Sequence, residues 1–265
     1  MRSVADAGLV VTGGGSGIGA ALCRRFAAEG GRVVVNDLDA AAAAQVAASC
    51  GAVALPADAA SEEGVATLIS GARAELGEID LFCANAGIVR SGGAEAAEAD
   101  WDASWQVNVM AHVRAVRLLL GPWLERGSGH LICTVSAAGL LSMPGAAPYS
   151  VTKHAALAFA EWLAVSYAHR GLVVQAVCPL GVRTAMFDAS GPSAELLLGE
   201  AAIAPEAVAD AVIEGIASGR FLILPHPEVA GMYAGRAAET DRWLRGMSKL
   251  QQRLEELGQG PTRRA

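Results

Sequence analysis

Lysine and tyrosine are scarce in this sequence. Lys153 and Lys249 are the only lysines among 20 basic residues, and Tyr149, Tyr167 and Tyr233 are the only tyrosines. Arginine therefore supplies nearly all of the positive charge. One of the two lysines nevertheless follows a tyrosine by four positions, within the apolar stretch PYSVTKHAALAF. This exception indicates that an ammonium group, and not merely a positive charge, is needed at position 153.

Excess positive charge and cysteine motifs are also missing. The net charge is −7 and no basic face precedes the C-terminal tail, which argues against a nucleic-acid partner. The five cysteines form no C-x-x-C motif and no metal-ligand spacing, so no metal site is expected. Cys83, Cys133 and Cys178 lie in apolar runs, where a thiol acts as a small hydrophobic group. A reducing cytoplasmic compartment is therefore expected.

Apolar runs long enough to cross a membrane are absent as well. Residues 127–152 contain no Asp, Glu, Lys or Arg, but glycine and proline interrupt this run too often for a spanning helix. The N-terminus places Asp6 soon after its first arginine and makes a poor signal peptide. We expect a soluble protein with no membrane partner.

Short β-branched runs alternate with alanine-rich stretches along most of the chain. The runs predict strands near 8–12, 32–36, 52–56, 79–84, 129–135, 172–178 and 221–224. The intervening stretches predict helices near 17–30, 39–49, 61–76, 98–126, 148–170 and 205–219. Continuously apolar strands that alternate with helices are typical of a parallel sheet covered on both faces. The pattern predicts an α/β fold: one doubly wound, Rossmann-type domain over residues 1–265, with a seven-stranded parallel sheet flanked by helices.

Two segments depart from this alternation. Residues 185–204 form a long connection after the sixth strand, and connections of that length often act as lids. Residues 228–258 are predicted to be helical, with an apolar stripe at heptad spacing: Trp243, Met247, Leu250, Leu254 and Leu257. The stripe should pack on its own domain or on a neighbouring subunit, and the spacing does not choose between them.

The segment LVVTGGGSGIGAAL leads from the first strand through glycines into a helix. Gly13, Gly17 and Gly19 would let the main chain approach a pyrophosphate at the helix N-terminus. Asp37 ends the second strand, where a carboxylate can bind both ribose hydroxyls of NAD and would repel the additional phosphate of NADP. The alternative interpretation is that Asp37 caps the next helix. We favour NAD as the cofactor.

Tyr149 and Lys153 are predicted to share one face of a helix that begins at Pro148. A nearby ammonium favours the ionised form of a phenol, so Lys153 should lower the pKa of Tyr149. Tyr149 would then serve as a general acid or base. A cation beside a core tyrosine is the structural alternative, but neither Tyr167 nor Tyr233 has a lysine four residues later.

Together these motifs resemble the short-chain dehydrogenase/reductase family. The resemblance covers about residues 8–184 and rests on elements that stand in the family's order and spacing: Thr12-Gly13-x3-Gly17-Ile18-Gly19, Asp58, Asn85-Ala86-Gly87, Asn108, Ser136 and Tyr149-x3-Lys153. It implies that Tyr149 is the acid/base and that Ser136 hydrogen-bonds the substrate oxygen. It also implies that Lys153 binds the nicotinamide ribose and that Asn108 holds a water in a proton relay.

The same resemblance implies which residues line the cofactor cleft. These are Gly13, Gly17, Ile18, Gly19, Asp37, Leu38, Asp58, Ala59, Asn85, Ala86, Gly87, Tyr149, Lys153, Pro179, Val182 and Thr184. The sequence departs from the family pattern at two positions. Ala84 replaces the first of two asparagines, and Leu180 stands where the family has glycine after Pro179. Leu180 would therefore add bulk to the pocket.

The candidate substrate-pocket residues are apolar: Leu140, Leu141, Met143, Leu180, Met186, Phe187 and Leu196–Leu198. Such a lining suits a hydrophobic secondary alcohol or its ketone, although some of these residues could instead pack the lid shut. Arg90 and Arg183 would meet an anion or serve as structural charges. The helix AALAFAEWLAV is apolar nearly all round, which predicts a subunit interface and a homodimer or homotetramer.

Three other functions have to be weighed against an NAD-dependent dehydrogenase. An NADP-dependent ketoreductase would need a basic residue near 37–38. A non-catalytic dinucleotide-binding protein could dispense with the four expected catalytic residues, which are all present: Asn108, Ser136, Tyr149 and Lys153. A methyltransferase that uses S-adenosylmethionine would explain the glycines but not the Tyr149-x3-Lys153 pair.

Overall fold

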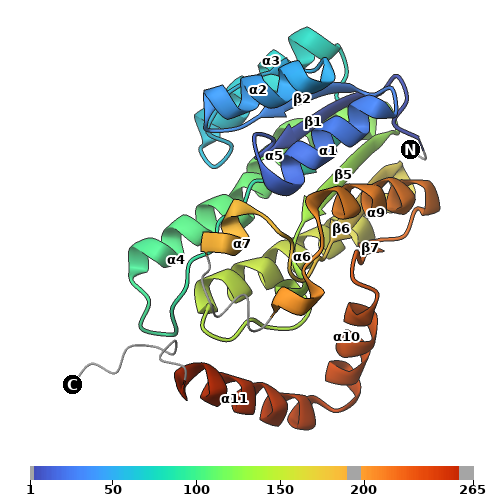
Figure 1. Cartoon of the computed structure of the whole chain (residues 1–265). Coiled ribbons are helices and arrows are strands. Elements are labelled where there is room, and N and C mark those ends of the chain that lie inside the picture. The colour runs from blue at the N-terminus through green and yellow to red at the C-terminus, as the bar shows by residue number, and fades with distance from the viewer. Residues whose placement is uncertain (1–2, 190–197, 257–265) are drawn as a thin grey trace.

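The computed structural model describes residues 3–189 and 198–256. Within these residues seven strands form one parallel sheet in the order β3-β2-β1-β4-β5-β6-β7 (Figure 1). The strands are β1 (Gly8–Thr12), β2 (Arg32–Asn36), β3 (Val53–Ala54), β4 (Leu81–Ala84), β5 (Gly129–Thr134), β6 (Leu172–Val177) and β7 (Leu222–Ile223). The predicted doubly wound, seven-stranded sheet is therefore confirmed. The strand order reverses between β1 and β4, and such a switch point opens a crevice at the carboxyl ends of the strands.

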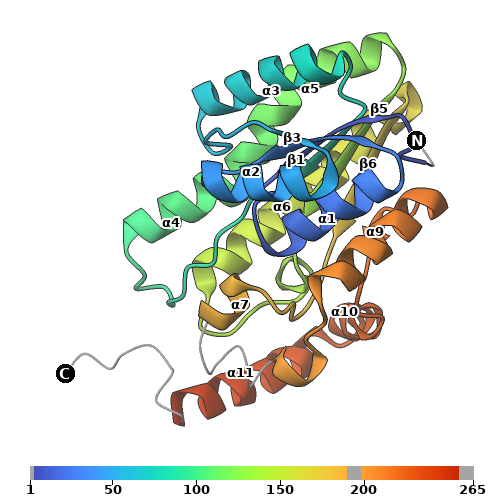
Figure 2. The same ribbon diagram turned by 45° about the horizontal axis from the view of Figure 1, so that its top comes forward.

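Helices cover both faces of this sheet. Buried apolar side chains pack α1 (Gly17–Ala28), α2 (Ala40–Cys50) and α9 (Pro205–Ser218) on one face. They pack α3 (Glu62–Leu76), α5 (Ala111–Glu125) and α6 (Ala147–Tyr167) on the other. Figure 2 shows α3 and α5 on one side of the strands and α1 and α9 on the other. The strands are apolar throughout because side chains on both of their faces are buried.

The helix predicted over 98–126 is interrupted. It consists of α4 (Glu98–Trp105), a π-helical segment η1 (Gln106–Met110) and α5. Asn108 lies in η1 and is fully buried, so its amide has to bond within the protein. A single π-helical turn inside a helix is often found at functional sites.

The predicted lid and tail have more structure than their sequences indicate. The lid begins with α7 (Ala185–Ala189) and ends after the short helix η4 (Gly199–Ala201), whereas Leu196 and Leu197 lie outside the described residues. The tail is two helices, α10 (Glu228–Ala238) and α11 (Thr240–Glu256), and not one. Glu239 between them has φ −134° and ψ 61°, which ends α10 and turns α11 beneath the rest of the molecule (Figure 1). Leu257, the last residue of the predicted stripe, lies outside the described residues.

Several large apolar side chains remain exposed on the helices around α6. Trp162, Val165 and Val151 of α6 are 56%, 84% and 48% exposed, and Leu118 of α5 is 40% exposed. The predicted subunit interface remains a prediction. None of the helices within the described residues has the length and apolar character needed to cross a membrane.

Candidate active site

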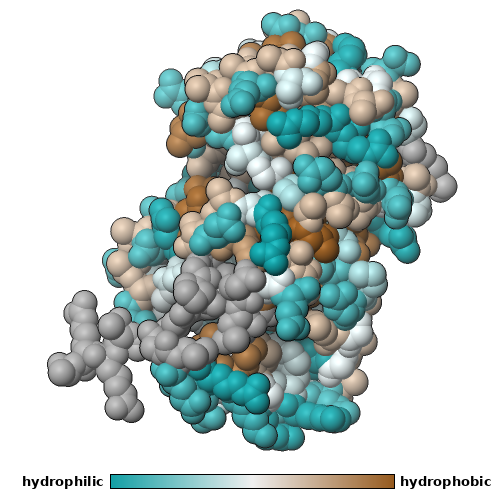
Figure 3. Space-filling model, viewed as in Figure 1, coloured by the Kyte–Doolittle hydropathy of each residue, from teal (hydrophilic) through white to brown (hydrophobic). Residues whose placement is uncertain are grey.

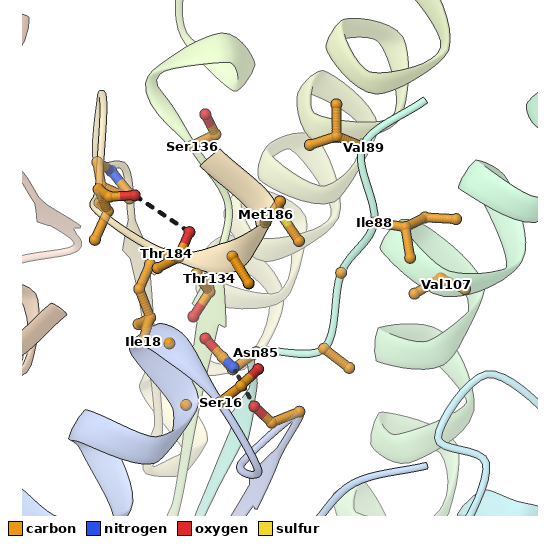
Figure 4. Close-up of a pocket in the computed structure, with 18 of the residues that line it drawn as sticks. Ser16, Ile18, Asn85, Ile88, Val89, Val107, Thr134, Ser136, Thr184 and Met186 are labelled. Atoms are coloured by element: carbon orange, nitrogen blue, oxygen red, sulfur yellow. Dashed lines mark hydrogen bonds between the residues drawn. The ribbon is translucent and has the colours of Figure 1, made fainter. Parts of the chain in front are cut away.

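A cleft of about 430 Å³ opens at the carboxyl ends of the strands. Every residue predicted to bind the cofactor lines it: Gly13, Gly17, Ile18, Gly19, Asp37, Leu38, Asp58, Ala59, Asn85, Ala86, Gly87, Tyr149, Lys153, Pro179, Val182 and Thr184. Ser136 lines it as well. Figure 4 shows Ile88, Val89 and Val107 on one side of the cleft, opposite Ile18 and Thr184 on the other.

The glycine loop between β1 and α1 leaves no room for side chains. Gly13 has φ +62° and Gly17 has φ +49°, a region that favours glycine. A Cβ atom on Gly19 would lie 2.0 Å from the carbonyl oxygen of Gly13. Helix α1 starts at Gly17, and Ser16 makes no side-chain cap, so the first N–H groups of the helix remain available for an anion. This cradle fits the pyrophosphate of a dinucleotide.

Asn85 and Thr12 tie the ends of β4 and β1 together. The Asn85 side-chain amide donates to the carbonyl oxygen of Thr12 at 3.0 Å. The main-chain N–H groups of Asn85 and Ala86 both donate to Oγ1 of Thr12, each at 3.0 Å. These bonds hold the main chain at the switch point where the cleft opens.

Asp37 is directed to the glycine loop and does not cap a helix. Its Oδ2 accepts from the Gly15 N–H at 2.9 Å, and its Oδ1 accepts from the Asp39 N–H at 3.0 Å. Asp39 is the residue that caps α2, through bonds from Ala41 and Ala42. The interpretation of Asp37 as the helix cap is therefore wrong. Among the described residues that line the cleft, Lys153 is the only basic one.

Tyr149 and Lys153 are brought together by the first turns of α6, as predicted. The ammonium nitrogen of Lys153 lies 5.7 Å from the centre of the Tyr149 ring and donates to the Thr134 carbonyl oxygen at 2.9 Å. Lys153 is 3% exposed, so this lysine is not a surface charge. Its length lets it cross from α6 to the end of β5.

The expected lowering of the Tyr149 pKa is not found. Burial raises the pKa of Tyr149, and a hydrogen bond with Ser136 offsets only part of this change. Burial also lowers the pKa of Lys153 to about 8. The physical reason is the same for both groups, because removal from water disfavours the phenolate and the ammonium alike.

Ser136 stands between β5 and the short helix η2 (Ala137–Gly139). Its hydroxyl oxygen accepts from the Ala138 N–H at 3.1 Å, and its hydrogen bond with Tyr149 lowers the pKa of that phenol. The thirteen-residue separation between Ser136 and Tyr149 is thus closed by the turn from β5 into α6. The two hydroxyl groups share one end of the cleft.

Asn108 lies behind the cleft and does not line it. Its Oδ1 accepts from the Ile88 N–H at 2.9 Å, and its Nδ2 donates to the Ile88 carbonyl and to Thr152 Oγ1 at 3.0 and 3.1 Å. A Cβ atom on Gly87 would lie 3.3 Å from both Asn108 Oδ1 and Lys153 Nζ. Asn108 and Lys153 therefore flank the same glycine.

Comparisons with known proteins agree with this geometry. The family model described as short chain dehydrogenase matches residues 8–194. The chain belongs to the short-chain dehydrogenase family. It is 35% identical over 229 residues to 1-deoxy-11-beta-hydroxypentalenate dehydrogenase of Streptomyces exfoliatus, covering 83% of this chain and 82% of that protein. It is 29% identical over 225 residues to human epidermal retinol dehydrogenase 2, and this match covers 80% of this chain and 73% of that protein.

A solved structure extends the likeness to the full chain. A short chain dehydrogenase/reductase of Burkholderia phymatum, in complex with NAD, has a TM-score of 0.82 and 26% identity, and the match covers 100% of this chain and 99% of that one. The present short-chain dehydrogenase is an oxidoreductase of alcohol or ketone groups in small molecules, in a family that uses nicotinamide dinucleotides.

Most of the predicted pocket residues of this short-chain dehydrogenase line the cleft. Met143, Leu180, Met186 and Phe187 are among them. Leu140 is not: its side chain is 1% exposed and packs in the core beneath α6. Arg90 pairs with Asp100 at 3.3 Å, and Arg183 donates to the Gly199 carbonyl at 2.9 Å, so both make structural contacts.

Sequence reasoning missed two parts of the site. Ile88, Val89 and Val107 form an apolar wall of the cleft, and the first two follow Asn85-Ala86-Gly87 directly. The second part is a cavity between Ser136 and the helices α10 and α11. The apolar stripe of the tail was the signal for it. Trp243, Met247 and Leu250 of that stripe line this cavity, and Leu254 is buried.

Proposed function

We propose that this chain is an NAD(H)-dependent dehydrogenase that interconverts a hydrophobic secondary alcohol and its ketone, with Tyr149 as the acid/base. The observation that carries the proposal is the group formed by Tyr149, Ser136 and Lys153 in the cleft beside the glycine cradle. This group supports the proposal because it puts a hydroxyl that can exchange a proton in the same cleft as the glycine loop.

The charges in the cleft favour NAD over NADP. The Asp37 carboxylate uses one acceptor position on the Gly15 N–H and one on the Asp39 N–H, and further lone pairs remain for ribose hydroxyls. An additional phosphate near this carboxylate would be repelled. The described lining residues offer no cation besides Lys153, which lies at the opposite end beside Tyr149.

Each polar group has a separate task in the reaction. A bound nicotinamide dinucleotide would supply the hydride acceptor in oxidation and the hydride donor in reduction. Tyr149 takes the hydroxyl proton of the alcohol at its phenol oxygen, and returns a proton to the oxygen in the reverse reaction. Ser136 hydrogen-bonds the same substrate oxygen and stabilises the phenolate form of Tyr149. Lys153 binds the nicotinamide ribose.

Burial raises the pKa of Tyr149, so this phenol needs positive charge nearby to act as a base. Lys153 remains mostly protonated at pH 7 because its pKa is about 8. The charge of an oxidised nicotinamide in the cleft would add to that of Lys153. We propose that Asn108, next to Lys153 at Gly87, holds a water through which the proton leaves the buried site.

The proposed substrate is apolar around its reacting carbon. Met143, Leu180, Met186 and Phe187 line the cleft near Ser136 and Tyr149, and residues 185–204 would cover it as a lid. Two relatives are named as dehydrogenases of 1-deoxy-11-beta-hydroxypentalenate and of retinol, which supports this class. We further propose one cytoplasmic domain that assembles as a homodimer or homotetramer through α4, α5 and α6.

A Tyr149→Phe variant tests the catalytic assignment. It should lower kcat for alcohol oxidation by at least about 10³-fold, because the proton acceptor is removed, while NADH affinity changes less than threefold. Turnover is followed by NADH absorbance over a panel of apolar secondary alcohols, and affinity by NADH fluorescence. Turnover within tenfold of wild type would remove Tyr149 from the reaction.

Fluorescence titration with NADH and NADPH tests the cofactor assignment. The wild-type chain should bind NADH more tightly, and Asp37→Ala should shift the affinity ratio toward NADPH by at least about tenfold because a repelling carboxylate is removed. Asp39→Ala is the matched control: it removes a helix cap two residues away and should leave the ratio unchanged. Tighter binding of NADPH by the wild-type chain would overturn the NAD assignment.

A further inference from the structure

A second cavity of about 630 Å³ lies beside the cleft, between the Ser136 turn and the C-terminal helices. Ser136, Met143, Leu180 and Leu198 line both spaces, so the two adjoin each other at Ser136. The far walls are supplied mainly by α10 and α11, through Met232, Gly235, Arg236, Trp243, Gly246, Met247 and Leu250. We call this space the distal chamber.

The amphipathic character of α11 matches this placement. Trp243, Met247 and Leu250 of the apolar stripe line the distal chamber, and Leu254 is 2% exposed. The lower edge of the molecule, formed by α11, is covered by hydrophilic side chains in Figure 3, with hydrophobic ones between it and the body. The apolar face of α11 is therefore directed to the chamber, whose lining also includes the charged residues Glu228, Glu239 and Arg242.

Two polar residues hold these helices against the catalytic core. His226, just before α10, accepts from the Leu180 N–H at 3.1 Å and bonds the Ala201 carbonyl at 2.9 Å. Arg236 donates to the carbonyl oxygens of Leu140 and Leu141, which follow the Ser136 turn. Its guanidinium also lies 4.9 Å from the centre of the Trp243 ring.

Arg236 also reaches the catalytic helix α6. Its Nη1 lies 3.1 Å from Nε2 of His154, the residue after Lys153. His154 Nδ1 bonds the Ser150 carbonyl at 2.9 Å, which fixes Nε2 as an acceptor. Arg236 thus joins the Ser136 turn, α6 and α11, and positions the chamber wall relative to Tyr149.

We propose that the distal chamber binds the hydrocarbon body of the substrate, and that α10 and α11 thereby select bulky apolar alcohols and ketones over small ones. This inference rests on the proposed function, because it places the reacting oxygen at Ser136 and Tyr149. The chamber begins at Ser136. The hydrocarbon groups on the carbon that carries the reacting oxygen would therefore extend from Ser136 into the chamber. The volume is that of a site for a drug-sized ligand.

Glycines in the two helices allow a test that does not depend on weakening the fold. A Cβ atom on Gly235 or Gly246 would meet no atom within 4 Å, and both residues line the chamber. Leucine at these positions adds bulk to the chamber and is a better helix former than glycine. Gly231 of α10 also has open space around its Cβ position but does not line the chamber, so Gly231→Leu is the matched control.

The double variant Gly235→Leu/Gly246→Leu should discriminate by substrate size. Its kcat/KM for 2-dodecanol and for androsterone should fall at least about tenfold, whereas that for cyclohexanol should change less than twofold. Gly231→Leu should leave all three values unchanged. An equal loss for all three alcohols, or no loss for the two large ones, would overturn the proposal.

Equilibrium binding separates this inference from the proposed reaction. Calorimetric titration with 2-dodecanone and androstanedione should show at least one of them bound by the wild-type chain and weakened about tenfold or more in the double variant. If that loss occurs while no alcohol is oxidised, the chamber assignment stands and the proposed function fails. If the wild-type chain binds neither ketone, the chamber assignment fails whatever the activity.

Discussion

The end of the cleft that we propose binds the dinucleotide phosphates (the phosphate end) is walled by main chain. The end that we propose binds the substrate (the substrate end) is walled by side chains carried on helices. At the phosphate end, Gly13 and Gly19 approach so closely that a Cβ atom has no place, and Asn85 clamps the neighbouring strand. At the substrate end, only Val229 and Leu254 are buried among the residues described in α10 and α11. The helices there are held by a few polar contacts, chiefly those of Arg236.

This difference follows from what each end has to recognise. A pyrophosphate is bound by N–H groups in fixed positions, and main-chain geometry supplies them only if the chain turns sharply. An apolar body is bound by the removal of its surface from water, which many side-chain combinations achieve. Substitutions should therefore have large effects at the first end and graded effects at the second.

The largest effect is expected at the glycine loop. Gly19→Ala places a Cβ atom 2.0 Å from the Gly13 carbonyl oxygen and 2.7 Å from Asn85 Nδ2, so the loop has to move. NADH affinity, measured by fluorescence titration, should fall at least about 100-fold because the loop's N–H groups are displaced. Gly121→Ala in α5, where the added atom meets nothing within 4 Å, is the control. A loss below threefold would show that this end also tolerates side chains.

The next effect is expected at the junction of the two ends. Ser136→Ala removes the hydrogen bond that lowers the Tyr149 pKa, so that pKa should rise further. Oxidation needs the phenolate, and its rate should fall by roughly 10² with the rising limb of kcat/KM against pH displaced to higher pH. The same profile is measured for Ser218→Ala, which lies far from the cleft on α9. An unshifted limb would contradict the role of Ser136 in tuning Tyr149.

A smaller effect is expected at Arg236, whose hydrogen bonds hold α10 and α11 against the rest of the domain. Arg236→Met removes the charged hydrogen bonds to Leu140 and Leu141, so local opening of α10 and α11 should become easier by roughly 2 kcal/mol. Thermolysin should cleave within α11 about 30-fold faster, while NADH affinity stays within twofold. Arg242→Met is the control, because the partner of Arg242 among the described residues is Glu239, in an exposed contact. Equal cleavage rates for both variants would show that Arg236 does not fasten the helices.

The smallest effect concerns stability and pH. His112 of α5 is 1% exposed, and burial lowers its pKa to about 3. Its folded pKa lies below the unfolded value near 6.5, so stability is lost as pH falls below 6.5 toward 3. The loss at pH 5.5 is about 1.4 kcal/mol.

His112→Leu should remove this loss, so the free energy of unfolding falls less between pH 7.5 and 5.5 than in the wild-type chain. Urea denaturation at the two pH values measures it. The control is His169→Leu, because His169 is exposed. This variant should show the same change in the free energy of unfolding between the two pH values as the wild-type chain. If the His112→Leu variant retains the wild-type slope, His112 is not the buried neutral group described here.

The sequence predicted the cofactor cleft more completely than the chamber. The glycines, Asp37 and Asn85-Ala86-Gly87 lie at strand ends, and the parallel pattern of strands already brings those ends to one edge of the sheet. By contrast, Leu140 points into the core although it follows Ser136, because the turn of η2 reverses its direction. The break at Glu239 and the contacts of Arg236 depend on residues far apart in the chain and carry no local signal.

By itself, the sequence determined the alternation of strands and helices, the sharp turns at glycine and the four-residue spacing of Tyr149 and Lys153. Each of these follows from short-range rules, because it involves residues within one or two turns of the chain. Only the tertiary structure decided that burial raises the Tyr149 pKa and lowers that of Lys153. It also decided that the tail closes a chamber at Ser136, because desolvation and enclosure depend on every element packed around a group.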